Sequence, residues 1–196
     1  MVTSFAKFMV VGGLLRQAIG AQQTPPNTVL AGIALILSIH VMAPVIGEVT
    51  TNLKPLLAMS EAERAAQHPQ LVAAVVGPLG RFLRRNAAEE NRATFSAIAA
   101  ESGGAPEAVA QYREAYDVLT IDAPAFLITE LSEAFQIGFL LFVPFLVIDL
   151  VVTNILLALG AQTLTPTALT LPLKILLFLL ADGWRLVLHG LARSYA

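Results

Sequence analysis

Two long uncharged stretches enclose a polar middle in this chain. No charged residue occurs between Gln17 and Gly47. Another uncharged stretch covers residues 134–148, and after Asp149 the next charged residue is Lys174. Strand-like alternation persists nowhere, whereas apolar residues recur at helical spacing. The pattern predicts an all-α fold: membrane-associated helical hairpins flanking a polar helical middle domain.

The N-terminal third predicts two apolar helices. The first, Phe5–Ile19, is too short to cross a bilayer by itself, whereas the second, from Val29 to about Ile46, approaches the roughly 20 residues that a span needs. Thr24, Pro25, Pro26 and Asn27 mark the helix start, because proline is tolerated in a first turn and Thr or Asn can cap it. Pro44 lies inside the second helix and is read as structural punctuation.

The polar middle predicts short helices. Ser60 and Glu63 have the spacing of a capping box, in which each side chain satisfies the other residue's backbone N–H. Gly103-Gly104 interrupts the chain, and Pro106-Glu107 opens another short helix.

The last third predicts a helical hairpin with arms at about Pro124–Leu159 and Pro166–Leu191, preceded by Asp122 as a helix cap. An ionised side chain facing hydrocarbon costs about 2.5–3.5 kcal/mol by insertion scales. We therefore expect these arms to pack against other copies or homologous partners, with acids and bases paired. The polar and kinking residues inside the arms are Pro144, Asp149, Asn154, Pro172, Lys174 and Asp182.

Composition supports a membrane-associated class. Apolar residues make up 56% of the chain and charged residues 13%, against roughly 25% charged in soluble domains. Residues 48–133 carry 19 of the 26 charged side chains and are net acidic, whereas the flanks are net basic. This division predicts segments 1–47, 48–121 and 122–196. Because basic residues favour the cytoplasmic side, it also predicts chain ends toward the cytoplasm and a middle toward the periplasm.

The sequence predicts no enzyme, cofactor or metal site. Cysteine is absent and no nucleophile-elbow, phosphate-loop or zinc-protease motif occurs. The three histidines have no metal-ligand spacing, and a net charge of −2 gives no basic field for nucleic acid. Two alternatives remain open: an intramembrane enzyme using Asp149 and Asp182, and a proton-conducting or transporter-type subunit using Asp149 and Lys174. Trp184 is interpreted as an interfacial anchor or packing residue.

Four motifs together carry a family resemblance. They are LLRQAIGAQQTPPNTVL at Leu14–Leu30; Met42-Ala43-Pro44-Val45; Glu130-Leu131, Ala134-Phe135 and Gly138-Phe139 followed by PFLVIDL at Pro144–Leu150; and LPLK at Leu171–Lys174, with LLF at Leu176–Phe178 and Asp182-Gly183-Trp184. In this order they closely resemble the FliP/SctR (YscR) family, the core inner-membrane export-apparatus subunit of flagellar and virulence type III secretion systems.

The resemblance implies a pentameric ring that continues with two small homologous subunits and meets the large export-gate subunit. The assembly encloses a channel for unfolded secretion substrates. It further implies inter-subunit ion pairs of Glu130, Asp149 and Lys174, and a constriction loop at the hairpin tip. In family members that tip commonly carries methionines, whereas here it reads Leu159, Gly160, Ala161, Gln162, Thr163 and Leu164.

Family members usually carry a further apolar segment before the position of Met1, so we expect the chain to begin inside the first helical region. The missing tip methionines and the stretch FLRRNAAEENRATF at Phe82–Phe95 favour a virulence-type system over a flagellar one.

Overall fold

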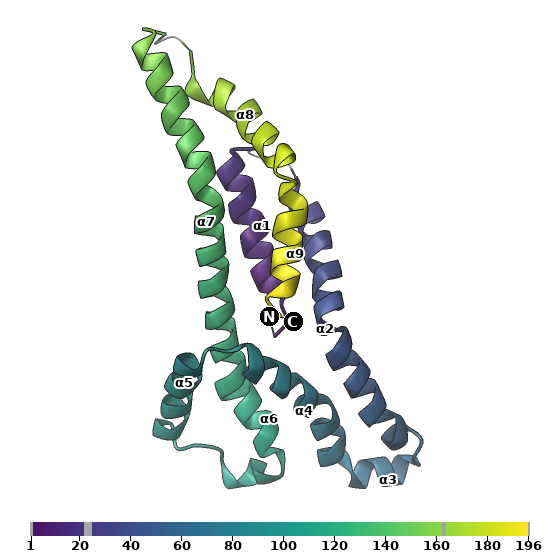
Figure 1. Ribbon diagram of the computed structural model, residues 1–196. Helices are drawn as coiled ribbons and strands as arrows, with labels where there is room; N and C mark the ends of the chain where they lie inside the picture. Colours follow the sequence, from purple (N-terminus) through teal and green to yellow (C-terminus); the bar gives the residue numbers. More distant parts are fainter. Residues whose placement is uncertain (1, 22–24, 162–163, 196) are drawn as a thin grey trace. The chain divides into compact units, whose positions relative to one another are not determined.

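The computed structural model describes residues 2–21, 25–161 and 164–195, and within these ranges the regular structure is helical without strands (Figure 1). This confirms the predicted all-α class. The elements are α1 (Phe5–Ile19), α2 (Asn27–Leu57), α3 (Glu61–Ala66), α4 (His68–Asn86), α5 (Glu89–Glu101), the 3₁₀ helix η1 (Glu107–Tyr112), α6 (Arg113–Asp117), the π-helical turn η2 (Val118–Asp122), α7 (Ala123–Ala158), α8 (Pro166–Leu180) and α9 (Gly183–Arg193).

The chain forms two compact units. Unit 1 contains Met1–Ser4 and Ile39–Leu131, and unit 2 contains Phe5–Ser38 and Ser132–Ala196. Each of the two long helices, α2 and α7, therefore begins in one unit and ends in the other. Unit 2 brings together the two apolar stretches, and unit 1 contains the polar middle.

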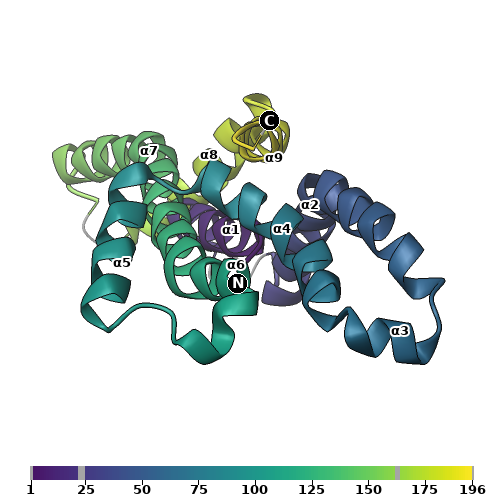
Figure 2. The same cartoon turned by 90° about the horizontal axis from the view of Figure 1, so that it is seen from below.

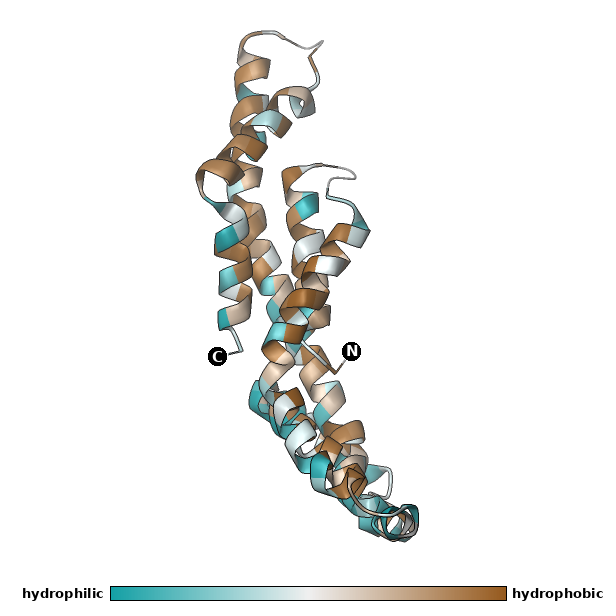
Figure 3. Cartoon of the chain, turned by 90° about the vertical axis from the view of Figure 1, so that its right-hand side faces the viewer, coloured by the Kyte–Doolittle hydropathy of each residue, from teal (hydrophilic) through white to brown (hydrophobic). Residues whose placement is uncertain are grey.

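The core of unit 2 is small. Leu15, Ala18 and Ile19 of α1 pack with Phe145 of α7 and Phe178 of α8. Figure 3 shows how far apolar residues extend over the helices of this unit. Many large apolar side chains therefore remain exposed, and a surface of this kind marks a contact with other proteins or with lipid. The exposed set on α7 includes Phe135, Phe139, Leu140, Val143, Leu146, Val147, Leu150, Val151, Ile155 and Leu157.

Unit 1 packs its short helices around the beginning of α7 (Figure 2). Leu83 of α4, Val118 of η2 and Phe126 of α7 are buried. Gly80 allows α4 to approach η2 closely, because a Cβ atom at this position would overlap Val118. The predicted capping box is confirmed: Ser60 accepts from the backbone N–H of Glu63, and the Glu63 carboxylate accepts from the backbone N–H of Ser60.

Several predicted helix limits were wrong. The second helix continues past Ile46 to Leu57 with Pro44 and Pro55 inside it, and the hydroxyl of Thr50 donates to the carbonyl of Ile46 at 2.7 Å. Asp122 does not cap the last third, because η2 runs without interruption into α7. Asn27 belongs to the first turn of α2, and its side chain accepts from Arg16 at 2.6 Å instead of capping the helix.

The returning arm bends where we predicted a continuous helix. α8 ends at Leu180, and α9 begins at Gly183 after Asp182, whose φ of 50° is left-handed. Gly183 lies so close to the ring of Phe178 that a Cβ atom would overlap it. Trp184 packs edge-on against the same ring, with the two centroids 5.4 Å apart. These contacts fix the bend.

The first turn of α1 lies beside the segment that follows α9. Lys7, near the N-terminus, contacts Tyr195, near the C-terminus, and pairs with Glu133. Glu133 is the second residue of unit 2 after the chain returns from unit 1. That the chain ends face the cytoplasm and the polar middle faces the periplasm stays a prediction.

Candidate functional site

One buried charge of unit 2 is Lys174 on α8. Its side chain is 7% exposed, and its Nζ atom lies 2.6 Å from Oδ2 of Asp149 on α7. The same ammonium donates to the carbonyl oxygen of Ala18 in α1 at 3.2 Å. Asp149 is partly open, with 38% of its side chain exposed. One cation therefore connects three helices, and one carboxylate neutralises it.

The end of α1 is shaped to receive this cation. Gly20 follows the helix with a φ of 84°, a conformation that costs glycine little, and its N–H donates back to Arg16 and Gln17. The last carbonyl groups of a helix lack partners and form the negative end of its dipole. The Lys174 ammonium is well placed at this end, because it is both a hydrogen-bond donor and a positive charge.

A second buried lysine lies at the other end of α1. Lys7 is 1% exposed, and its Nζ atom is 2.7 Å from Oε2 of Glu133 on α7. The Tyr195 ring covers the same ammonium, with Nζ 4.3 Å from the ring centroid, and also packs edge-on against Phe8. Lys7 therefore fastens α1 to α7 and to the segment that follows α9. Sequence reasoning assigned no partner to Lys7.

The structure brings together two of the three residues predicted to form ion pairs. Asp149 and Lys174 pair within one chain, whereas Glu130 is buried on the part of α7 that belongs to unit 1. That neighbouring subunits share these charges stays a prediction.

The predicted constriction loop lies between α7 and α8. Leu159 is 75% exposed and Leu164 is also exposed. Gly160 has a φ of 69°, and Ala161 donates its N–H to Leu156. Gln162 and Thr163 lie outside the described residues.

The prolines and the tryptophan that carry the family motifs lie in unit 2, except for Pro44 in the second half of α2. Pro144 and Pro172 lie inside α7 and α8, as Pro44 does in α2. Pro26 offers its carbonyl oxygen to Val29 and Leu30 in the first turn of α2, and Pro25 accepts weakly from Arg16 at 3.5 Å. Thr24 lies outside the described residues.

Unit 1 contains a charge cluster that sequence reasoning missed. Asp122, with only 3% of its side chain exposed, accepts from Arg84 of α4 at 2.7 Å and from Arg92 of α5 at 3.2 Å. Thr129, a little further along α7, accepts from Asn91 and from the backbone of Ala88. These contacts join α4, α5 and the start of α7. The arginines are 38 and 30 residues from Asp122, so no local pattern indicates the pairing.

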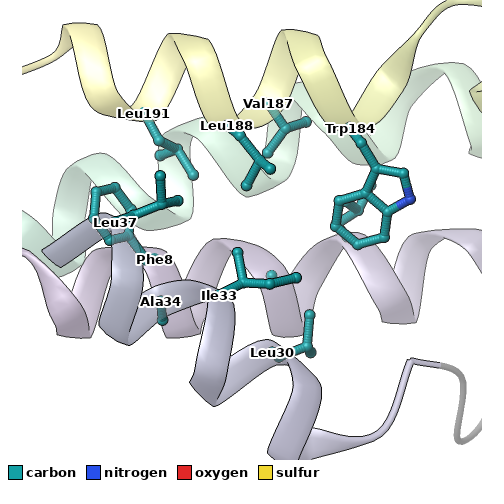
Figure 4. A pocket seen from close by; sticks show the side chains of 11 residues that line it. Phe8, Leu30, Ile33, Ala34, Leu37, Trp184, Val187, Leu188 and Leu191 are labelled. Atoms are coloured by element: carbon teal, nitrogen blue, oxygen red, sulfur yellow. The ribbon is translucent and has the colours of Figure 1, made fainter. Parts of the chain in front are cut away.

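A narrow apolar crevice runs between α1, α2 and α9 (Figure 4). The two flanking helices each contribute residues at the spacing i, i+3, i+4 and i+7, which is one face of a helix. From α2 these are Leu30, Ile33, Ala34 and Leu37, and from α9 they are Trp184, Val187, Leu188 and Leu191. The first part of α2 and α9 therefore extend along the same stretch of α1.

Two helical runs are long and apolar enough to cross a membrane by length and composition: Asn27–Leu57 and Glu107–Ala158. Between them they include most of the exposed apolar residues described above. Among residues 2–21, 25–161 and 164–195, no group of three or more His, Asp or Glu side chains could hold a metal ion.

Comparison with known proteins finds close relatives over the whole chain. The model of the FliP family matches residues 1–191. The chain is 43% identical over 195 residues to the hypersensitivity response secretion protein HrcR of Ralstonia nicotianae, covering all of this chain and 88% of HrcR. It is 42% identical over 197 residues to the flagellar biosynthetic protein FliP of Caulobacter vibrioides (all of this chain, 69% of the relative). Virulence protein YscR of Salmonella typhimurium is 38% identical over 196 residues (all of this chain, 88% of the relative).

Proposed function

The chain belongs to the FliP family, and we propose that it is a structural subunit of a type III secretion export apparatus in the bacterial inner membrane. In this role it forms, with other copies of itself, the channel through which unfolded secretion substrates leave the cytoplasm. The relatives named for virulence secretion and for flagellar biosynthesis both support a part in protein export.

The observation that carries the channel role is the combination of buried ion pairs with unpartnered apolar faces. Most of the large side chains of α7 beyond Phe135 are exposed in a single chain, while Lys174 and Asp149 are held between helices of the same unit. A helix set of this kind is incomplete alone, because it has apolar surface to bury and charge that must stay away from hydrocarbon. Contacts with neighbouring subunits bury the apolar surface and keep the charges away from hydrocarbon.

The proposed partners follow from family membership. They are further copies of this chain in a ring that is pentameric in the family, the two small homologous export-apparatus subunits, and the large export-gate subunit. Glu130, Asp149 and Lys174 contribute charges at these subunit contacts. The loop 159–164 forms the constriction, with Leu159 and Leu164 as its exposed apolar groups.

We assign the polar middle to the periplasmic side, because it carries a clear excess of acidic residues. Of the two kinds of machine, we propose the virulence-type system, on the basis of the missing tip methionines.

The test is assembly and secretion in the bacterium that carries the chain. Deletion is expected to abolish type III secretion, and the affinity-tagged chain is expected to purify from membranes as a large complex containing several copies. A monomer surrounded by detergent, in cells that still secrete normally, would overturn the proposal. Reconstituted complexes also address the alternative of a proton-conducting subunit, for which Asp149→Asn would reduce proton flux across liposomes without changing the size of the complex.

A further inference from the structure

The outward face of α9 carries a row of basic residues. Arg185, His189 and Arg193 are spaced four apart, which puts them on one side of the helix. All three are exposed, and Arg185 has 84% of its side chain in the open. We call these three residues the α9 basic stripe. Figure 3 shows hydrophilic positions along this last helix.

The stripe is almost free of acidic neighbours. Asp182 approaches Arg185 at 3.5 Å, with both side chains largely exposed. Among the described residues, the side chains of His189 and Arg193 take part in no ion pair. The exposed Asp182–Arg185 pair contributes little stability and is screened by salt. The stripe therefore presents its charge outward.

The two helices that flank the apolar crevice, α2 and α9, differ on the sides that face away from it. Trp184, Val187, Leu188 and Leu191 face the crevice that α9 shares with α1 and α2 (Figure 4). Leu35 and Ile36 of α2, in the helix segment that lines the same crevice, are exposed, Ile36 to 69%. At one level of unit 2, the outer side of α2 is therefore apolar, whereas the outer side of α9 carries the α9 basic stripe beside one exposed leucine, Leu186. The two sides cannot face the same solvent, because a cation facing acyl chains is costly.

From this we propose that the α9 basic stripe lines the water-filled conduit of the assembled apparatus and contacts the acidic side chains of unfolded polypeptides in transit. The inference rests on the channel role proposed above and specifies which surface of the chain faces the channel. Opposite charge selects the occupant: a field from two arginines attracts carboxylates and repels lysine-rich segments. The apolar side of α2 is then left for lipid or for partner helices.

The natural absence of cysteine permits a direct test. His189→Cys introduces a single thiol into the stripe, and Ile36→Cys is the matched control on the apolar side. Each variant is expressed in place of the native chain, and its incorporation into the complex and its secretion are measured first. Membranes are then treated with two water-soluble thiosulfonate reagents, one anionic and one cationic, with and without a substrate jammed in the channel.

The stripe position is expected to react, and the anionic reagent is expected to react about threefold faster than the cationic one because of the flanking arginines. A jammed substrate should slow this reaction several-fold, while Ile36→Cys stays unreactive. In an added Arg185→Glu/Arg193→Glu background, the preference between the two reagents should reverse.

Two results would overturn the inference while leaving the proposed function intact. In the first, complexes form and secrete but the jammed substrate gives no protection, which puts the stripe outside the path. In the second, the thiol is shielded without substrate and crosslinks to lipid or to a neighbouring subunit, so that anionic headgroups or an acidic subunit surface cover the stripe. Failure of the proposed function looks different, because the chain would then be absent from the complex or unnecessary for secretion.

Discussion

The ammonium of Lys174 lies 2.6 Å from the carboxylate of Asp149 and also donates to the last turn of α1 through the carbonyl of Ala18. The helix α1 and the two consecutive helices α7 and α8 meet at this one side chain. Without it, the partly buried Asp149 carboxylate loses its partner and the Ala18 carbonyl loses a donor. We therefore regard Lys174 as the residue that holds α8 in register with α1 and α7.

Lys174→Ala is expected to destabilise unit 2 by about 3 kcal/mol. This value is at the lower end of the range for breaking a buried ion pair, because Asp149 is partly open to solvent. Assembly fails as a consequence, and secretion is lost. Native gels of solubilised membranes and secretion assays measure the two effects together. Lys54→Ala, at an exposed position of α2, is the matched control and should assemble normally. Intact complexes that do not secrete would contradict the assembly explanation.

Replacing both partners separates charge from packing. The double variant Lys174→Met/Asp149→Leu removes the two charges together and leaves apolar groups of similar size. It is expected to recover part of the stability lost by Lys174→Ala, since an apolar replacement of a buried ion pair is often tolerated. If Asp149 and Lys174 were proton-relay groups instead, this variant would assemble but conduct no protons.

Asp122 has the same importance for unit 1. Its buried carboxylate accepts from Arg84 and Arg92. Asp122→Asn removes this buried counter-charge and leaves the two arginines only their more exposed pairs with Glu114 and Glu89. We expect unit 1 to lose about 3 kcal/mol of stability, which limited proteolysis of the full chain would report as faster cleavage between α4 and α7. Asp117→Asn is the control, because its pair with Arg113 is largely exposed and contributes at most about 1 kcal/mol. Equal protease resistance of Asp122→Asn and the native chain would refute this role.

Local signals in the sequence predicted part of this structure well. The predicted limits of α1, Phe5–Ile19, match the structure, the start of α8 follows from Pro166, and the capping box of Ser60 and Glu63 follows from spacing alone. Each of these features depends on residues within one turn of helix.

Features that depend on distant contacts were missed. The role of Asp122 rests on arginines 30 and 38 residues away. The partner of Lys174 in α1 is a backbone carbonyl, and every residue has one, so no residue type marks it. The failure at α2 lies beyond Ile46: Pro55 would end a helix that lacked support, and only the folded chain shows that the helix continues to Leu57.

The bend at Asp182 gives a prediction about backbone strain. Its φ of 50° is accessible to aspartate at moderate cost but is unfavourable for β-branched residues. Asp182→Val is expected to destabilise unit 2 by about 1–2 kcal/mol, whereas Asp182→Gly should change stability little. Thermal unfolding of the two detergent-purified variants makes the comparison. If valine were accepted as readily as glycine, the left-handed bend would not be a feature of the folded protein.

The capping box predicts a pH dependence confined to α3. Hydrogen bonds from the Ser60 hydroxyl and from its backbone N–H lower the pKa of Glu63 below its ordinary value of 4.5. A carboxyl group whose folded pKa is lowered stabilises the helix at pH values above its unfolded pKa. This contribution is lost as the pH falls below 4.5 and through the lower folded value. The protection of the α3 amides, measured relative to their intrinsic exchange rate at each pH, should therefore fall over this acidic range.

Glu63→Gln should remove that acidic dependence. Glu61→Gln should keep it, because Glu61 lies two residues before Glu63 and does not make the Ser60 contacts. The effect is small because Glu63 is fully solvent-exposed. Exchange in α3 that responds to acid equally in both variants would mean that another group titrates.

Two glycines of the last helix make a matched pair for testing how tightly the bend is packed. A Cβ atom at Gly183 would overlap the ring of Phe178, which is itself held between Phe145 and Trp184, so the ring has little room to move. Gly183→Ala should therefore destabilise unit 2 by about 1–3 kcal/mol, the usual cost of overpacking. Gly190 has no neighbour within 4 Å of such an atom, and alanine there should stabilise α9 by roughly 0.5–1 kcal/mol. Thermal unfolding should thus shift in opposite directions for the two variants, with a loss of near-UV tryptophan signal only in Gly183→Ala. Shifts in the same direction would show that α8 and α9 adjust freely at the bend and that Phe178 does not fix it.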